Sequence, residues 1–204
     1  MKENILEFYV NKFYHLNSLD SADVTFIPPI LRRKTSSVDK AALTVMNKTY
    51  DDNIQNIVFS SQFGEVERLL KIIDQYTLDK EVSPNIFSSS VHNYTVGFFL
   101  FNIKKTIPYT ALSATDSSIS AGLTTSAISK YDNTLYCFCD VNDNKVMAFS
   151  VNISKKRNEN ALKFRLTLKD NKNLKDDFND FVKLFKGEIK ELETPSIKLE
   201  RIEE

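Results

Sequence analysis

The sequence predicts an α/β domain, because apolar runs of strand length are followed by longer segments of helical pattern. The clearest pair is the run NIVFS at 56–60, followed by helical spacing of apolar residues over 65–76. A second pair is the run YTAL at 109–112, expected to be a buried strand, followed after a turn by a small-residue helix reaching 129. Strand-to-helix units of this kind build a parallel or mixed sheet.

Composition and charge exclude several classes of function. The chain has 204 residues, of which 42% are hydrophobic, enough for one packed domain without disulfides. Its 27 basic and 27 acidic residues balance, which argues against a nucleic-acid partner. The longest mainly apolar stretch, 94–103, is shorter than the roughly 20 residues that span a bilayer, and the N-terminus lacks a signal-peptide core. We therefore predict a cytoplasmic protein without membrane contact.

The two cysteines, Cys137 and Cys139, lie in one apolar run. At this spacing on a strand both side chains point to the same face. Both histidines are distant in sequence, so neither a zinc site nor any other metal or cofactor is expected. The pair is interpreted as two small buried side chains in a reducing compartment.

In chain order, residues 4–16 show helical spacing of apolar side chains and predict an amphipathic helix. Pro28 and Pro29 then impose an extended segment. Ser36 or Ser37 is expected to cap the next helix. Its apolar stripe consists of Val38, Ala41, Ala42, Val45 and Met46.

The middle of the chain contains three further helix signals. Gly64, just before the helix over 65–76, indicates that another group approaches the backbone closely. Ser83 and Pro84 form a helix start, and a second start follows near 90–93. The helix over 94–103 is apolar almost all round, so it is expected to be buried on several sides or to lie against a partner subunit.

The last third predicts strands over 134–141, 146–153 and 162–168, then a long amphipathic helix over 170–192. The apolar positions of that helix are Leu174, Phe178, Phe181, Val182, Phe185 and Ile189. We expect one domain over 1–193 and a loose polar tail over 194–204.

The turn at 113–118 is the strongest candidate for chemistry. A strand that turns sharply into a helix presents free backbone N–H groups, which suit a nucleophile, an oxyanion or a phosphate. However, the turn carries Thr115 and Asp116, and neither is a strong nucleophile. The pattern is therefore compatible with an active site, a former active site or an ordinary helix cap.

His92 is a candidate base for Thr115 or a nearby serine, although a histidine that hydrogen-bonds backbone at a helix start is the simpler interpretation. The sequence has no G-x-S-x-G, no G-x-G-x-x-G and no P-loop motif. The adjacent cations Arg32, Arg33 and Lys34 are compatible with an acidic protein or a phosphate, or with a solvated turn in which one arginine is paired internally.

Four segments together resemble the amino-terminal half of β-ketoacyl synthases, in particular the small ketosynthase-like family found beside aryl polyene and polyketide synthesis enzymes. They are IPPILRRKTSSVDKAALT (27–44), NIVFSSQFGEVERLL (56–70), VSPNIFSSSVHNYTVGFF (82–99) and YTALSATDSSISAGL (109–123). The resemblance implies a thiolase-like half, with a mixed five-stranded sheet covered by helices.

The resemblance also implies where the nucleophile would be. In a synthase the strand-turn-helix carries a cysteine that accepts the acyl chain, and the helix N-terminus lowers the pKa of its thiol. The segment ATDSS places Thr115 at that position, followed by Asp116. The two catalytic histidines of a synthase belong to its carboxy-terminal half, and His92 matches neither. We therefore expect no catalytic residue, a degenerate nucleophile position at Thr115, and at most residual roles for Asp116 and His92.

By the same resemblance, the chain is expected to be a non-catalytic subunit, similar to a chain length factor, that forms a heterodimer with a full-length β-ketoacyl synthase. Aryl polyene, polyketide or fatty-acid-type elongation are the processes implied. The interface candidates are Tyr94, Phe98, Phe99, Phe101, Tyr109, Leu112 and Ile119. Arg32 and Arg33 are candidates for contact with an acyl carrier protein.

Two other functions remain open at this point. One is a reduced acyltransferase or decarboxylase that acts on carrier-protein thioesters through Thr115 or His92. The other is a purely structural domain that associates with itself, as a homodimer.

Overall fold

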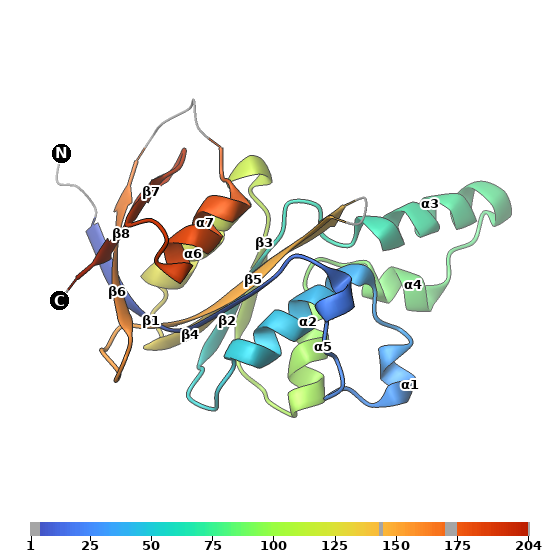
Figure 1. The fold of residues 1–204 in the computed structure, drawn as a ribbon. Coiled ribbons are helices and arrows are strands. Elements are labelled where there is room, and N and C mark those ends of the chain that lie inside the picture. Colours follow the sequence, from blue (N-terminus) through green and yellow to red (C-terminus); the bar gives the residue numbers. More distant parts are fainter. Residues whose placement is uncertain (1–4, 143–144, 170–174, 204) are drawn as a thin grey trace.

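The computed structural model describes residues 5–142, 145–169 and 175–203, and within these ranges the chain forms three layers (Figure 1). One mixed sheet is the middle layer. Helices α6 (Ser118–Ile128) and α7 (Phe178–Lys186) cover one face, and α2 (Ser37–Thr49) and α5 (Tyr94–Ile103) cover the other. The predicted α/β class is confirmed.

The sheet has eight strands in the order β3-β2-β4-β5-β1-β6-β8-β7. Their bounds are β1 Ile5–Leu16, β2 Asn56–Ser60, β3 Tyr109–Leu112, β4 Asn133–Asn142, β5 Lys145–Ser154, β6 Leu162–Leu168, β7 Glu191–Glu193 and β8 Ile197–Ile202. Strand β2 runs parallel to β3 and β4, and the other pairs are antiparallel. The expectation of five strands is wrong, because segments near both ends of the chain extend the sheet.

The remaining helices are α1 Pro29–Arg32, α3 Val66–Asp79 and α4 Pro84–Ser89. Short 3-10 turns lie at Leu19–Ser21 and Thr115–Ser117. Ser36 is the N-cap of α2, and its hydroxyl accepts from the Asp39 N–H while the Asp39 carboxylate accepts from the Ser36 N–H. The predicted strands at 56–60, 134–141, 146–153 and 162–168 and the predicted helices that correspond to α2, α3 and α5 are confirmed.

Successive side chains of β4 point to opposite faces of the sheet, so this strand contributes to the hydrophobic core on each face. Tyr136 and Phe138 point to the layer of α6 and α7, whereas Leu135, Cys137 and Cys139 point to the layer of α2 and α5. Both cysteines are fully buried and free, as predicted. Burial raises the pKa of both thiols well above the usual value, so neither is ready to react.

The predicted helix over 4–16 is wrong, because this segment is strand β1 between β5 and β6. Phe8 and Val10 point into the core of α6 and α7, and a register shift between Val10 and Lys12 then changes the alternation. Beyond it, Phe13 lies in that core and Leu16 in the opposite one. A register shift interrupts the two-residue alternation of apolar side chains along a strand. The apolar positions that remain are spaced as they would be in a helix.

The long helix predicted over 170–192 is also wrong. Helix α7 ends at Lys186, because Gly187 adopts φ 81° and the N–H groups of Gly187 and Glu188 bond the carbonyls of the last turn. Part of the prediction, including Leu174, lies outside the described residues. The expected loose tail is strand β8, in which Ile197 and Leu199 are fully buried.

Candidate functional site

The strand-turn-helix predicted from the sequence is present, and the backbone of its turn is strained. Strand β3 ends at Leu112 and α6 starts at Ser118. Between them Thr115 has a φ of 49°, which is an outlier for a β-branched side chain. Strand β3 is not buried as expected, because it forms the edge of the sheet and the Tyr109 side chain is exposed.

Hydrogen bonds within the turn engage the hydroxyl of Thr115. Its Oγ1 donates to the carbonyl of Ala114 at 2.8 Å. The Ser118 hydroxyl donates to the Thr115 carbonyl at 2.8 Å and accepts from the Ala114 N–H at 3.0 Å. These contacts hold the unusual backbone in place, and none of them joins Thr115 to a base.

The N-terminus of α6 is bonded by a carboxylate from another part of the chain. Asp176, in the loop before α7, accepts from the Ser120 N–H at 2.7 Å and also from the Ser120 hydroxyl. Its own N–H donates to the Asp116 carbonyl at 3.2 Å. Burial raises the pKa of the Asp176 carboxyl, although the bonds from Ser120 act in the opposite direction. Nothing in the sequence marked Asp176, because it lies 56 residues from Ser120.

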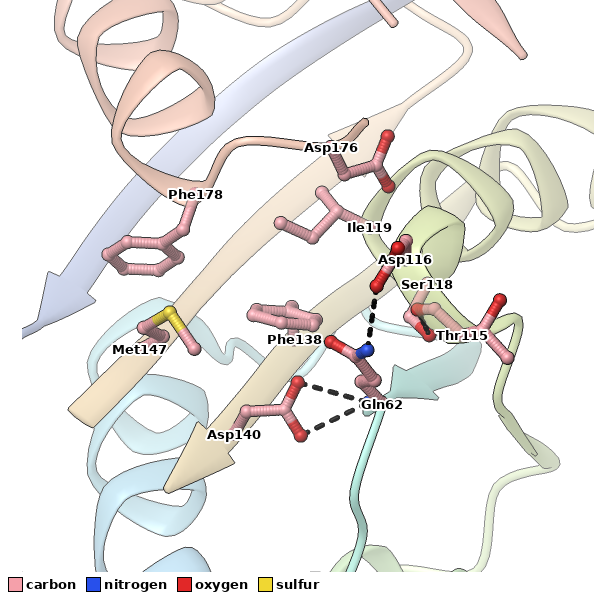
Figure 2. Close-up of a pocket in the computed structure, with 10 residues that line it drawn as sticks. All are labelled: Gln62, Thr115, Asp116, Ser118, Ile119, Phe138, Asp140, Met147, Asp176 and Phe178. Carbon is pink, nitrogen blue, oxygen red and sulfur yellow. Dashed lines mark hydrogen bonds between the residues drawn. The ribbon is translucent and has the colours of Figure 1, made fainter. Parts of the chain in front are cut away.

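A second set of polar contacts closes the other side of the turn (Figure 2). The Gln62 side chain donates to Asp116 at 2.9 Å, while the Gln62 N–H bonds the Asp140 carboxylate at 3.0 Å. Lys175 pairs with Asp116 at 3.0 Å, and this contact lowers the pKa of the Asp116 carboxyl. Burial raises the pKa of Asp140.

The space left between these groups is small. A cavity of about 70 Å³ lies among Gln62, Thr115, Asp116, Ser118, Ile119, Phe138, Asp140, Met147, Asp176 and Phe178. Such a volume holds a few water molecules and is far below the several hundred Å³ of a typical ligand pocket.

His92 is close to the turn but does not contact Thr115. Its Nε2 lies 2.9 Å from the Leu112 carbonyl, so this nitrogen donates and is not a free base. The ring packs against Phe59, and Nδ1 lies where a side chain on Gly64 would be, at 2.9 Å from an added Cβ. Gly64 also has φ 59°. The close approach predicted at Gly64 is therefore made by His92.

The structure separates the interface candidates into three groups. Phe99 and Ile119 are buried in the two cores of the domain, so as interface contacts they are wrong. Phe101 is 70% exposed on α5, and Tyr109 is exposed on the neighbouring edge strand, where Asn93 donates to its hydroxyl. Tyr94, Phe98 and Leu112 are partly buried, and Tyr94 stacks on Phe98.

Arg32 and Arg33, the candidates for contact with a carrier protein, differ in whether their side chains are engaged within the chain. Arg32 Nε donates to the Ile27 carbonyl at 2.7 Å, which is the internal pairing that the sequence left open, whereas Arg33 is exposed.

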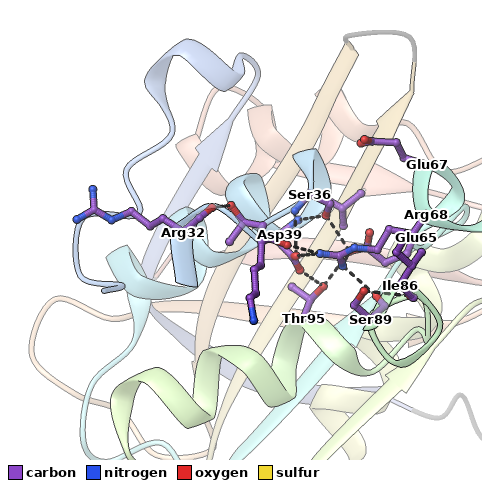
Figure 3. A network of polar contacts seen from close by, with 12 residues as sticks. Arg32, Ser36, Asp39, Glu65, Glu67, Arg68, Ile86, Ser89 and Thr95 are labelled. Carbon is purple, nitrogen blue, oxygen red and sulfur yellow. Dashed lines mark hydrogen bonds and ion pairs between the residues drawn. The ribbon is translucent and has the colours of Figure 1, made fainter. Parts of the chain in front are cut away.

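A buried ionic network, which sequence reasoning missed, anchors α3 and α4 to the domain (Figure 3). Arg68 pairs with Asp39 at 2.7 Å and with Glu65 at 3.1 Å, and it donates to the carbonyls of Ser89 and Lys34. Desolvation, followed by the charge of Asp39, raises the pKa of Glu65 to about 7. The one available signal was the Ser36–Asp39 spacing of a capping box.

Helix α3 leaves its apolar face uncovered. The predicted helix is confirmed, but its inward face carries Arg68 rather than the apolar stripe. The exposed apolar side chains of α3 and α4 are Leu69, Leu70, Ile73, Tyr76, Leu78 and Phe87. In Figure 1 these two helices extend beyond the end of the sheet. We call this projecting pair the α3–α4 arm.

The described part of the chain contains neither a metal-ligand cluster nor a membrane-spanning helix. Within it, no group of three or more His, Cys, Asp or Glu side chains is placed to hold a metal ion. Nor does any helix in the described ranges have the length and apolar character needed to cross a membrane.

Comparisons with known proteins agree with this architecture. A search of curated proteins gave no match. A solved structure titled as a ketosynthase (ApeO) in complex with its chain length factor (ApeC), from Xenorhabdus doucetiae, contains a similar chain. The TM-score is 0.75 at 15% identity, and the match covers 96% of this chain and 100% of that one. At this identity the likeness shows the fold, which is thiolase-like. Residues 10–190 match the family described as the β-ketoacyl synthase N-terminal domain, and the chain therefore belongs to that family.

Proposed function

We propose that this chain is a non-catalytic, chain-length-factor-like subunit that pairs with an active β-ketoacyl synthase. The observation that carries the proposal is the state of Thr115. It lies at the position where the family resemblance puts a cysteine, and its hydroxyl bonds the Ala114 carbonyl instead of a base. An alcohol without an activating base is a weak nucleophile.

Exposed apolar side chains support pairing. Phe101 is exposed on α5, and Tyr109 is exposed on the edge strand β3. The α3–α4 arm carries several further apolar side chains that are more than half exposed. Aromatic and aliphatic side chains gathered in this way are typical of a protein interface. The match to a solved ketosynthase–chain length factor complex is consistent with a partner of the same fold.

The finer assignments are part of the same proposal. The partner synthase would act in aryl polyene, polyketide or fatty-acid-type elongation in the cytoplasm, and this subunit would stabilise it and shape the tunnel for the growing chain. Arg33 replaces Arg32 as the better candidate for contact with an acyl carrier protein, because the guanidinium of Arg32 is engaged within the subunit.

The test is co-expression of the tagged chain with a full ketosynthase encoded beside it, followed by size-exclusion chromatography with light scattering. We expect a one-to-one heterodimer. Ile73→Glu on α3 and Phe101→Glu on α5 each place a charge among the exposed apolar side chains, and at least one of them should dissociate the complex. Glu159→Lys, an exposed change in the loop between β5 and β6, is the control and should not. A chain that stays monomeric or homodimeric beside the synthase would refute the pairing and favour self-association.

The enzymatic alternative is tested separately. Purified chain with malonyl carrier protein is assayed for acyl transfer and for decarboxylation, and we expect neither. Activity that disappears in Thr115→Ala or His92→Ala would refute the non-catalytic assignment.

A further inference from the structure

We infer that the Asp176 carboxylate occupies the start of α6 and makes this turn unable to activate any nucleophile at position 115. The absence of a cysteine is then only part of the reason why the turn is inactive. Even a thiol at this position would meet an environment that opposes its thiolate.

The contacts show that the carboxylate is held firmly. Both its oxygens interact with Ser120, one through the N–H and one through the hydroxyl. The Ser120 hydroxyl is in turn 2.9 Å from that of Thr194, which precedes β8. Asp176 therefore connects the loop before α7, the first turn of α6 and the β7–β8 turn.

The position of this carboxylate determines its electrostatic effect. The free N–H groups at the start of a helix favour a negative charge, and this is how such a terminus lowers the pKa of a nearby thiol. In this chain the Asp176 carboxylate already receives that stabilisation. A second anion at position 115, which lines the same cavity, would meet like charge instead.

The other charged groups around the turn do not cancel the negative charge that Asp176 brings to position 115. Asp116 is adjacent in sequence and pairs with Lys175, so the two nearly cancel. The Asp140 carboxylate accepts a hydrogen bond from the Gln62 N–H and adds further negative charge. His92 faces the carbonyl of Leu112 rather than the turn itself. The surroundings of position 115 are therefore net negative.

The effect of Asp176 is exerted at the turn that carries the proposed function, but it depends only on contacts within the chain. It would stand if no ketosynthase partner were found, and its failure would leave the pairing proposal intact.

The experiment uses Thr115→Cys as a reporter in the full chain. The pH dependence of alkylation by iodoacetamide gives the pKa of the new thiol, followed by mass spectrometry of the peptide that contains it. Cys137 and Cys139 are buried and are monitored as unreactive internal references. We expect the single variant to have a thiol pKa at or above the ordinary value of about 8.5.

Adding Asp176→Asn should lower that pKa by about one unit, which at pH 7 corresponds to a roughly tenfold increase in alkylation rate. Adding Asp180→Asn, at a partly exposed position on α7, should leave it unchanged. If Asp176→Asn prevents folding, Asp176→Ser, which also removes the negative charge and keeps an acceptor for the Ser120 N–H, should lower the pKa in the same direction. A thiol pKa well below 8 in Thr115→Cys alone, or no decrease in either combined variant, would overturn the inference.

Discussion

The turn around Thr115 and the α3–α4 arm differ in what they leave without a partner. At the turn, the Thr115 hydroxyl, the Ser118 and Ser120 N–H groups at the start of α6 and the Asp116 carboxylate are bonded within the chain. On the arm, apolar side chains such as Leu70, Ile73 and Tyr76 are more than half exposed. The polar groups that could do chemistry are satisfied, whereas the apolar groups that could bind a protein are not.

The two regions also use buried carboxylates in opposite ways. Asp176 has hydrogen-bond donors on both oxygens and stabilises a helix start. Glu65 is almost fully buried beside Asp39 and Arg68, and its Oε2 has no hydrogen-bond partner. Two acids share one arginine, so one acid is only weakly compensated. The difference teaches that the turn is closed by well-satisfied contacts, while the arm is attached through a network that is sensitive to charge.

The largest effect is expected from removing the arginine that attaches the arm. Arg68→Met leaves Asp39 and Glu65 buried without a cation, and breaking a buried ion pair typically costs about 3–5 kcal/mol. Urea unfolding should show this loss, and hydrogen exchange should show α3 and α4 opening first. Lys71→Met, which removes an exposed pair with Glu67 on the same helix, should change stability by less than about 0.5 kcal/mol. Equal effects of the two variants would contradict the role given to the network.

On the same side of the molecule as the turn, Gly122 lets α6 lie close against strands β2 and β4 of the sheet. An added Cβ would lie 2.7 Å from both the Ser60 hydroxyl and the Tyr136 hydroxyl, so Gly122→Ala should destabilise the domain by about 3 kcal/mol. The control is Gly97→Ala in α5, where the nearest atom would be 3.7 Å away. That variant should be neutral or slightly stabilising in thermal unfolding, because alanine favours helix. A stable Gly122→Ala would show that α6 is seated more loosely than described.

The dependence of the arm on charge predicts a change of stability with pH. The folded-state pKa of Glu65, about 7, lies above its value in the unfolded chain, so the folded state holds more protons between roughly pH 4.5 and 7. Its contribution to stability is complete below that window and is lost as pH rises through it. Glu65→Gln should therefore gain on the order of 2 kcal/mol relative to the native chain between pH 5 and pH 8, measured by urea unfolding.

Glu67→Gln is the control for this pH effect. Glu67 is exposed, and its bond from Lys71 lowers its pKa, so its substitution should add no slope between pH 5 and 8. A Glu65→Gln variant with the same pH profile as the native chain would contradict the proposed proton on Glu65.

The smallest effect concerns the strain in the turn. Thr115→Gly removes a β-branched side chain from a φ of 49° and should raise the unfolding free energy by about 1 kcal/mol. Thr124→Gly, within α6, should lower it by a similar amount because glycine weakens a helix interior. A destabilised Thr115→Gly would mean that contacts of the threonine side chain outweigh the strain.

Local chemistry predicted a large part of the fold correctly. The apolar runs at 56–60 and 134–141 became interior strands, and Ser36 capped α2 through a local bond to Asp39. The strand-turn-helix around Thr115 was also predicted, because it depends on neighbouring residues. One error arose in β1, where the apolar residues fit both the spacing of a helix and that of a strand with a register shift. Another arose at Gly187, where a single glycine ends α7.

The sequence by itself determined the α/β class, the family and the identity of the residue at the nucleophile position, because these depend on short stretches of chain. Only the tertiary structure decided that Asp176 reaches α6, that Arg68 joins Asp39 to Glu65, and that the apolar face of α3 points outward. The physical reason is distance along the chain. Each of these features joins residues from separate elements or depends on which face of an element the neighbouring elements cover, and such relations exist only after the layers have packed.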